Sequence, residues 1–280
     1  MKKVMVLGAG TMGAGIAQVA AVAGYQVMLR DTSREFVESG LAKIDKSLER
    51  AVKKERISLA EKQQILDRIQ CTTQLDVARE VDLIIEAILE NMELKTKVFS
   101  ELDALTPSHC ILASNTSALS ISQIASATKR PDKVIGMHFF NPVPVMKLVE
   151  VIKGSKTSEE TFNSTVRFVG SINKQPVAVN EAPGFVVNRL LVPLINEAVF
   201  MYSEGVSSAE EIDEAMKLGA NHPIGPLALA DMIGLDICLA VMETLHEEFG
   251  EDKYRPAPLL RKMVRAGDLG QKSGQGFYTY

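Results

Sequence analysis

A glycine-rich turn near the N-terminus is the feature that most constrains how this chain can fold. Three glycines stand at GxGxxG spacing within residues 8–13, directly after the apolar run Lys3–Leu7 and at the start of the helix-patterned segment Thr11–Ala23. Such glycines permit a tight turn, let the backbone approach a pyrophosphate, and allow a helix to pack closely on a strand. The amides that open the helix then face the anion. The predicted cofactor contacts here are Gly8, Gly10, Thr11, Met12 and Gly13.

An acidic residue follows the next predicted strand, Tyr25–Arg30. Asp31 lies 18 residues after Gly13, where a carboxylate can accept hydrogen bonds from the adenosine ribose and would repel a 2′-phosphate. The cofactor is therefore expected to be NAD, with NADP disfavoured. Arg30 and Arg34 flank the acid, and either would soften that discrimination. A turn that only packs a helix on a strand is the alternative, and strand, helix and acid together weigh against it.

Strand-like and helix-like segments alternate through the first 180 residues. Alternation of this kind predicts βαβ units and a Rossmann-type α/β domain with a mainly parallel sheet. The helix-length segments include Thr11–Ala23, Phe36–Lys54 and Met92–Leu105. The expected strands are Lys3–Leu7, Tyr25–Arg30, Val81–Ala87, Cys110–Ser114, Val134–Phe140, Lys147–Ile152 and Pro176–Val179.

After about residue 180 only helix-spaced apolar residues recur, which predicts an all-α C-terminal domain. The boundary is expected at Ala182-Pro183-Gly184, where proline and glycine interrupt the chain, giving domains of residues 1–182 and 183–280. The expected helices are Phe185–Glu204, Ala209–Leu218, Leu227–Phe249 and Leu259–Ala266.

Charge, hydropathy and cysteine content narrow the class of protein. A net charge of -4 argues against a general nucleic-acid binder, and no segment reaches the roughly 20 apolar residues of a membrane span. The three cysteines are odd in number, far apart and free of any CxxC pattern, which favours neither disulfides nor a metal site. We expect a cytoplasmic protein with no nucleic-acid or membrane partner.

One of the four histidines stands out as a candidate acid–base group. His138 interrupts the apolar run Val134–Phe140, and Glu150 interrupts another apolar run twelve residues later. If the chain folds back between them, the two side chains oppose each other on neighbouring strands, and a buried carboxylate would hold the imidazole in one tautomer. A hydride-transferring enzyme needs such a pair to exchange the substrate's hydroxyl proton. A core histidine beside a structural acid is an equally open alternative from the residues alone.

Two further polar sites are candidates for substrate contacts. Ser114-Asn115-Thr116-Ser117 follows a predicted strand, at the strand end where open α/β sheets bind ligands, although an N-cap and turn would also use these residues. Asn188 begins a mostly apolar helix, where its amide needs either a substrate oxygen or an interhelical partner.

A basic stripe marks the segment Leu41–Arg56. Lys43, Ser47, Arg50 and Lys54 recur at three- to four-residue spacing on one helix face. Such a face suits phosphate groups, but basic stripes are more often solvated surface.

Taken together, six segments resemble the 3-hydroxyacyl-CoA dehydrogenase family from end to end of the chain. They are GAGTMGAGIAQ (8–18), ASNTSALSI (113–121), IGMHFFNPVPVMKLVEVI (135–152), EAPGFVVNRLL (181–191), AMKLGANHPIGPLAL (215–229) and KSGQGFY (272–278). The resemblance implies reversible NAD-dependent oxidation of a short 3-hydroxyacyl-CoA, (S)-3-hydroxybutyryl-CoA to acetoacetyl-CoA, by a stand-alone enzyme that forms a homodimer through its helical domain.

The resemblance also implies a role for each matching residue. His138 would be the general acid/base, Glu150 its orienting carboxylate, and Ser117 and Asn188 the groups that position the substrate oxygen. Ala118 replaces a second serine often present in that loop. The further NAD contacts would be Asp31, Glu90, Lys95, Ser117, Asn141 and Lys272, and the CoA contacts Ser47, Lys54 and Ser117.

Two other functions stay open at this point. A hydroxyacid dehydrogenase acting on a free acid would not need the basic stripe. A non-enzymatic NAD-binding sensor would not need the set formed by His138, Glu150, Ser117 and Asn188.

Overall fold

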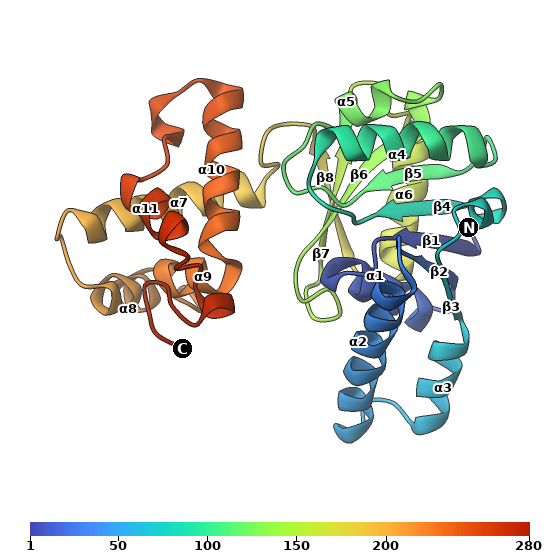
Figure 1. The fold of residues 1–280 in the computed structure, drawn as a ribbon, viewed down its shortest axis with the longest axis horizontal. Helices are drawn as coiled ribbons and strands as arrows, with labels where there is room; N and C mark the ends of the chain where they lie inside the picture. The colour runs from blue at the N-terminus through green and yellow to red at the C-terminus, as the bar shows by residue number, and fades with distance from the viewer. The chain divides into compact units, whose positions relative to one another are not determined.

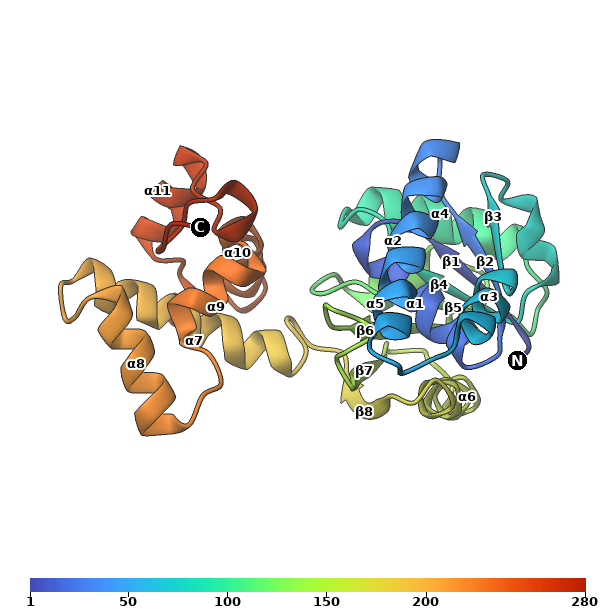
Figure 2. The same ribbon diagram turned by 90° about the horizontal axis from the view of Figure 1, so that it is seen from below.

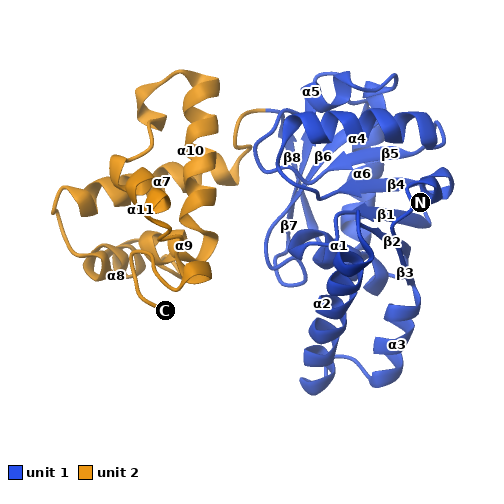
Figure 3. Ribbon diagram, viewed as in Figure 1, with its two compact units in different colours: residues 1–181 blue, residues 182–280 orange.

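The computed structural model describes residues 1–280, which form two compact units (Figure 3). The first unit comprises Met1–Glu181 and the second Ala182–Tyr280. This division lies one residue from the boundary expected from the sequence. The first unit is an α/β domain and the second is helical, as the sequence predicted.

A single eight-stranded sheet organises the first unit (Figure 1). Its strand order is β3-β2-β1-β4-β5-β6-β7-β8, and the six strands from β3 to β6 are parallel. β7 is antiparallel to β6, and β8 is parallel to β7. The order reverses between β1 and β4, so the carboxyl ends of these strands are where a ligand is expected. The strands are β1 (Lys3–Leu7), β2 (Gln26–Arg30), β3 (Ile69–Thr72), β4 (Leu83–Glu86), β5 (Ile111–Ser114), β6 (Val134–Phe139), β7 (Leu148–Lys153) and β8 (Gln175–Asn180).

Helices cover both faces of the sheet, which is why its central strands are apolar on both sides. α1 packs on β1 and β2, and α4 and α5 pack together beside β6. α6 packs on β7 and β8 (Figure 2). The helices of this unit are α1 (Thr11–Val22), α2 (Arg34–Lys53), α3 (Leu59–Asp67), α4 (Met92–Leu105), α5 (Ile121–Ser126) and α6 (Glu159–Ser171).

Helices α2 and α3 project from the sheet as an arm (Figure 1). The 20 residues of α2 make it about 30 Å long. Ser33 caps α2 by accepting a hydrogen bond from the Phe36 amide, and Ser58 with Glu61 forms a capping box on α3. A salt bridge of 2.8 Å between Lys62 and Asp45 joins the two helices. The arm therefore carries the basic stripe on a defined helical surface.

The second unit packs five helices around its own apolar core. The expected single helix Leu227–Phe249 is wrong, because Gly234 has φ 107° and divides it into two helices. Glycine adopts that conformation without the steric cost that other residues bear. The helices are α7 (Val187–Ser203), α8 (Ala209–Ala220), α9 (Pro226–Ile233), α10 (Leu235–Phe249) and α11 (Pro258–Ala266).

Strand β3 and helix α3 are not among the elements expected from the sequence. β3 is a four-residue edge strand with only one buried side chain, Ile69, so it lacks an apolar run that would have indicated it. α3 buries only Ile65, and its start is defined by the capping box of Ser58 and Glu61.

None of the helices combines the length and apolar composition needed to span a bilayer.

A buried carboxylate fastens the C-terminal segment onto the second unit. Asp231 accepts hydrogen bonds from the amides of Phe277 (3.0 Å) and Tyr278 (2.9 Å) and from the Tyr280 hydroxyl (3.2 Å). Asp213 accepts a further bond of 2.8 Å from the Tyr278 hydroxyl. Because both carboxylates are buried, their donors cannot be replaced by water.

Asp231→Asn should lower the free energy of unfolding of the second unit by about 2 kcal/mol, because an amide accepts fewer of these bonds and carries no charge. Urea denaturation followed by tyrosine fluorescence measures this, since four of the five tyrosines lie in this unit and the chain has no tryptophan. Glu247→Gln, an exposed charge change in α10, is the control. Equal stability of the two variants would contradict the anchoring role.

Candidate active site

The glycine turn joins β1 to α1 and has the geometry that a bound diphosphate requires. Gly8 has φ 95°, and a Cβ there would lie 2.4 Å from the Ala87 carbonyl oxygen. A Cβ on Gly13 would lie 1.7 Å from the Gly8 carbonyl oxygen. At Gly10, by contrast, a Cβ would meet nothing within 4 Å. Gly8 and Gly13 are therefore required by the fold itself, whereas Gly10 keeps space open above the turn.

The surroundings of the turn fit a dinucleotide. α1 begins without any side-chain cap and without an acidic residue in its first turn, so its leading amides can face an anion. Asp31, at the end of β2, accepts hydrogen bonds from the Ala9 amide (2.7 Å) and the Thr32 amide (2.6 Å). This places a carboxylate directly beside the turn, as the sequence predicted.

A cavity of about 240 Å³ connects the arm with the start of α1. Its lining includes Thr11, Ser47 and Asn141, three of the predicted contact residues. Lys43, Lys46 and Arg50 contribute its basic side. Lys54 follows the last residue of α2 and is exposed outside this lining.

His138 and Glu150 meet across the antiparallel pair β6 and β7. The register pairs the two residues directly, and His138 Nδ1 lies 2.7 Å from Glu150 Oε2. The glutamate is fully buried and the histidine is 4% exposed. Phe140 packs against the imidazole with ring centroids 4.5 Å apart. The carboxylate accepts the Nδ1–H, which makes Nε2 the nitrogen that carries the acceptor lone pair.

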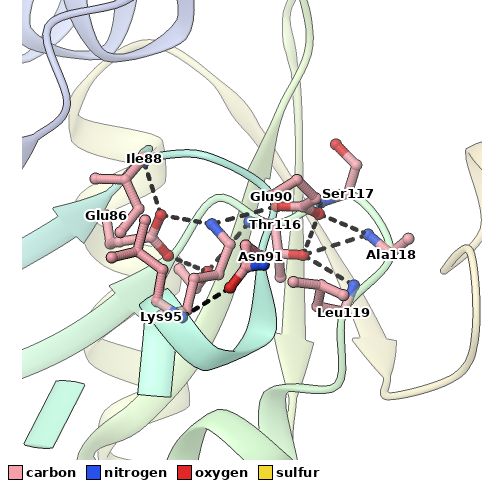
Figure 4. Close-up of polar contacts among 11 residues, drawn as sticks. Glu86, Ile88, Glu90, Asn91, Lys95, Thr116, Ser117, Ala118 and Leu119 are labelled. Atoms are coloured by element: carbon pink, nitrogen blue, oxygen red, sulfur yellow. Dashed lines mark hydrogen bonds and ion pairs between the residues drawn. The ribbon is translucent and has the colours of Figure 1, made fainter. Parts of the chain in front are cut away.

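The loop that contains Ser117 follows β5 and is held by hydrogen bonds to Glu90 (Figure 4). The Glu90 carboxylate accepts from the Thr116 hydroxyl (2.5 Å) and from the amides of Ser117 (2.8 Å) and Ala118 (3.3 Å). The Ser117 side chain points away from that carboxylate (Figure 4). The position of the loop therefore depends on where Glu90 lies.

Sequence reasoning missed Glu86 at this edge of the sheet, and it offered Asn115 only as a substrate contact or turn residue. Asn115 Oδ1 accepts the amide of Phe139, next to His138, at 2.9 Å. Glu86 ends β4 and pairs with the equally buried Lys95 at 2.5 Å. A signal for Glu86 was present, since it is an acid inside the apolar run Val81–Ala87.

The remaining predicted residues belong to the second unit. Asn188 is the second residue of α7 and is half-buried. Lys272 forms an ion pair with Asp236, at the start of α10. The structure describes each of these residues within its own unit, so their roles at the active site stay predictions.

The first unit has one other histidine, His109, and it does not join this site. Its Nε2 lies 3.2 Å from Asp82 Oδ1. That contact is exposed and lies near the start of β4, at the edge of the sheet opposite to the glycine turn. No group of three or more His, Cys, Asp or Glu side chains is arranged to hold a metal ion.

The first unit has the features of a dinucleotide-dependent oxidoreductase. They are the Rossmann-type sheet, the glycine turn with a carboxylate beside it, and the buried His–Glu pair. Comparisons with known proteins agree. Residues 3–182 match the NAD binding domain of 3-hydroxyacyl-CoA dehydrogenase, and residues 184–280 match the C-terminal domain of the same enzyme. The chain belongs to the 3-hydroxyacyl-CoA dehydrogenase family and is an NAD-binding enzyme.

Relatives of known name extend over the whole chain. A 3-hydroxybutyryl-CoA dehydrogenase of Clostridioides difficile is 56% identical over 278 residues, covering 99% of each chain. The human mitochondrial hydroxyacyl-coenzyme A dehydrogenase is 45% identical and covers 100% of this chain and 91% of its own. The crystal structure of an (S)-3-hydroxybutyryl-CoA dehydrogenase from Ralstonia eutropha has a TM-score of 0.97 at 52% identity, covering 100% of this chain and 99% of that one.

Gly10→Ala should leave the melting temperature nearly unchanged but weaken NADH binding at least about tenfold. The added methyl group has room in the fold and would occupy the space that the diphosphate needs. Gly13→Ala should instead destabilise the unit, because its methyl group collides with the backbone. Differential scanning fluorimetry and NADH fluorescence titration measure both effects. Undiminished NADH binding by Gly10→Ala would contradict the assigned position of the diphosphate.

Proposed function

We propose that this enzyme interconverts (S)-3-hydroxybutyryl-CoA and acetoacetyl-CoA. The single observation that carries the proposal is the buried 2.7 Å contact between His138 and Glu150 at the carboxyl end of β6, in a chain with a complete NAD-binding fold. The names of its most similar relatives support the four-carbon thioester as the substrate.

Bound NAD supplies the hydride acceptor in oxidation, and NADH the hydride donor in reduction. His138 Nε2 takes the proton of the substrate hydroxyl during oxidation and returns it to the forming alkoxide during reduction. Glu150 keeps the proton of the neutral ring on Nδ1 and stabilises the imidazolium when it forms. The burial of the pair strengthens this interaction, because little water screens it.

Ser117 and Asn188 orient the substrate oxygen toward His138. The hydrogen bonds that fix the Ser117 loop support this role, since a positioned donor contributes most when it needs no reorganisation. Both residues also match the substrate-contacting positions of the family.

The arm and its cavity bind the CoA portion of the substrate. Ser47 lines the cavity beside three basic side chains. Lys54 lies about two helical turns beyond Ser47 on the same stripe. Exposed ammonium groups attract phosphates without a fixed geometry. The resemblance that assigns Ser47 and Lys54 to CoA is thus consistent with the charge of this surface.

The NAD contacts are proposed to be the five turn residues 8 and 10–13 together with Asp31, Asn141 and Ser117. Glu90 and Lys272 complete the set that the family implies. The family also implies Lys95, whose side chain has no exposed surface and which contacts the carboxylate of Glu90. The carboxylate of Asp31 favours NAD over NADP, because a 2′-phosphate beside it would be repelled. The homodimer that the family implies is likewise proposed for this chain.

His138→Gln should lower turnover of acetoacetyl-CoA by about 10²- to 10⁴-fold, the usual contribution of general acid–base catalysis, and leave the affinity for NADH unchanged. Oxidation of NADH followed at 340 nm measures turnover, and fluorescence titration measures affinity. His109→Gln, at an exposed histidine away from the site, should keep wild-type turnover. Wild-type turnover by His138→Gln would remove this residue from the mechanism.

Lys54→Met should raise KM for acetoacetyl-CoA roughly 3- to 10-fold with little change in kcat, as expected for one exposed phosphate contact of about 1 kcal/mol. The difference from wild type should shrink at high ionic strength, because salt screens the pair. Lys97→Met, an exposed lysine on α4, is the control. An enzyme that reduces free acetoacetate as well as the thioester would favour the free-acid dehydrogenase instead.

A further inference from the structure

Glu86 and Lys95 form an ion pair with no exposed side-chain surface, in the first unit (Figure 4). Lys95 Nζ lies 2.5 Å from Glu86 Oε1. The same oxygen accepts the Ile88 amide at 2.8 Å, and Oε2 accepts the Ser114 hydroxyl at 2.6 Å. The Lys95 ammonium and the Ile88 amide can only donate, so Oε1 of Glu86 is the acceptor of both bonds.

The ammonium of Lys95 also reaches a second carboxylate. Glu90 Oε2 lies 3.2 Å from Lys95 Nζ, while Glu90 Oε1 accepts from the loop that carries Ser117. The Glu90 side chain is 42% exposed, so water competes for it. The ammonium of Lys95 on its buried side favours the orientation of this carboxylate toward the loop.

The ion pair lies between the cofactor turn and the substrate loop. Glu86 pairs in register with Leu7, the residue before Gly8. The Ala87 amide donates a hydrogen bond of 2.7 Å to the Leu7 carbonyl. On the other side, the Asn115 amide donates to the Glu86 carbonyl at 2.7 Å. Glu86 thus contacts the start of the substrate loop, and the next residue, Ala87, contacts the strand end that leads into the cofactor turn.

We propose that Glu86 and Lys95 are positioning residues that place Ser117 for the reaction. Glu86 fixes the ammonium of Lys95, Lys95 fixes the carboxylate of Glu90, and Glu90 holds the backbone of residues 116–118. Lys95 acts in this arrangement through Glu90, because its own side chain has no exposed surface. The inference rests on the proposed function, in which Ser117 orients the substrate oxygen.

The charges predict how single and double variants differ. Lys95→Met leaves Glu86 buried without a counter-ion, which is strongly destabilising. In Glu86→Gln/Lys95→Met both partners are neutral, which is far less costly than one unpaired charge. The double variant therefore recovers most of the stability while Glu90 still lacks its cation. It separates the structural role of the pair from its positioning role.

The experiment compares the full-length wild type, Lys95→Met and the double variant. We expect the double variant to recover most of the lost melting temperature but to keep kcat/KM for acetoacetyl-CoA about 10- to 100-fold below wild type. Hydrogen exchange at the amides of Ser117 and Ala118 should be at least about tenfold faster than in the wild type. Lys133→Met/Glu160→Gln, which removes a salt bridge elsewhere in the unit, is the matched control and should change none of these values.

Recovery of both stability and kcat/KM by the double variant, with unchanged exchange at residues 117 and 118, would overturn the positioning role and leave the proposed function standing. If the wild type does not oxidise NADH with acetoacetyl-CoA, the proposed function fails instead. In that case the exchange rates still decide whether Lys95 holds the loop.

Discussion

Two carboxylates, Glu86 on β4 and Glu150 on β7, are buried near the same end of the sheet, and the proposed active site depends on how each is paired. Glu150 is fully buried and meets His138, and Glu86 is fully buried and meets Lys95. An ionised carboxylate in such surroundings costs several kcal/mol unless a partner and further hydrogen bonds offset it. Each pair is therefore fixed in geometry. One of them contains the proposed acid–base group, and the other lies beside the proposed substrate loop.

The sheet brings these pairs to the glycine turn because parallel strands end at one edge. Four adjacent strands end there. Gly8 follows β1, Glu86 ends β4, the Ser117 loop follows β5, and His138 lies near the end of β6. β7 returns antiparallel, which is why Glu150 can lie opposite His138 although the two are only twelve residues apart. A helix connection and another parallel strand would not have produced this register.

The two units contain different parts of the functional machinery that we propose. The first unit contains the glycine turn, the His138–Glu150 pair and the basic arm, each built on regular elements. The second unit forms a separate core and fastens its own C-terminal segment through Asp213 and Asp231. Asn188 and Lys272, to which the family resemblance assigns substrate and cofactor contacts, belong to this second unit.

The sequence alone determined the strands of the central sheet, the glycine turn with Asp31 and the pairing of His138 with Glu150, because local patterns and a short connection specify them. It could not reveal edge strand β3, which has almost no apolar signal, or the break at Gly234, since a glycine within a helical pattern does not specify its own φ. It also could not join Glu86, Lys95 and Glu90 to the loop at residues 116–118. Those contacts span up to 28 residues and exist only once the ends of β4 and β5 are packed together with α4.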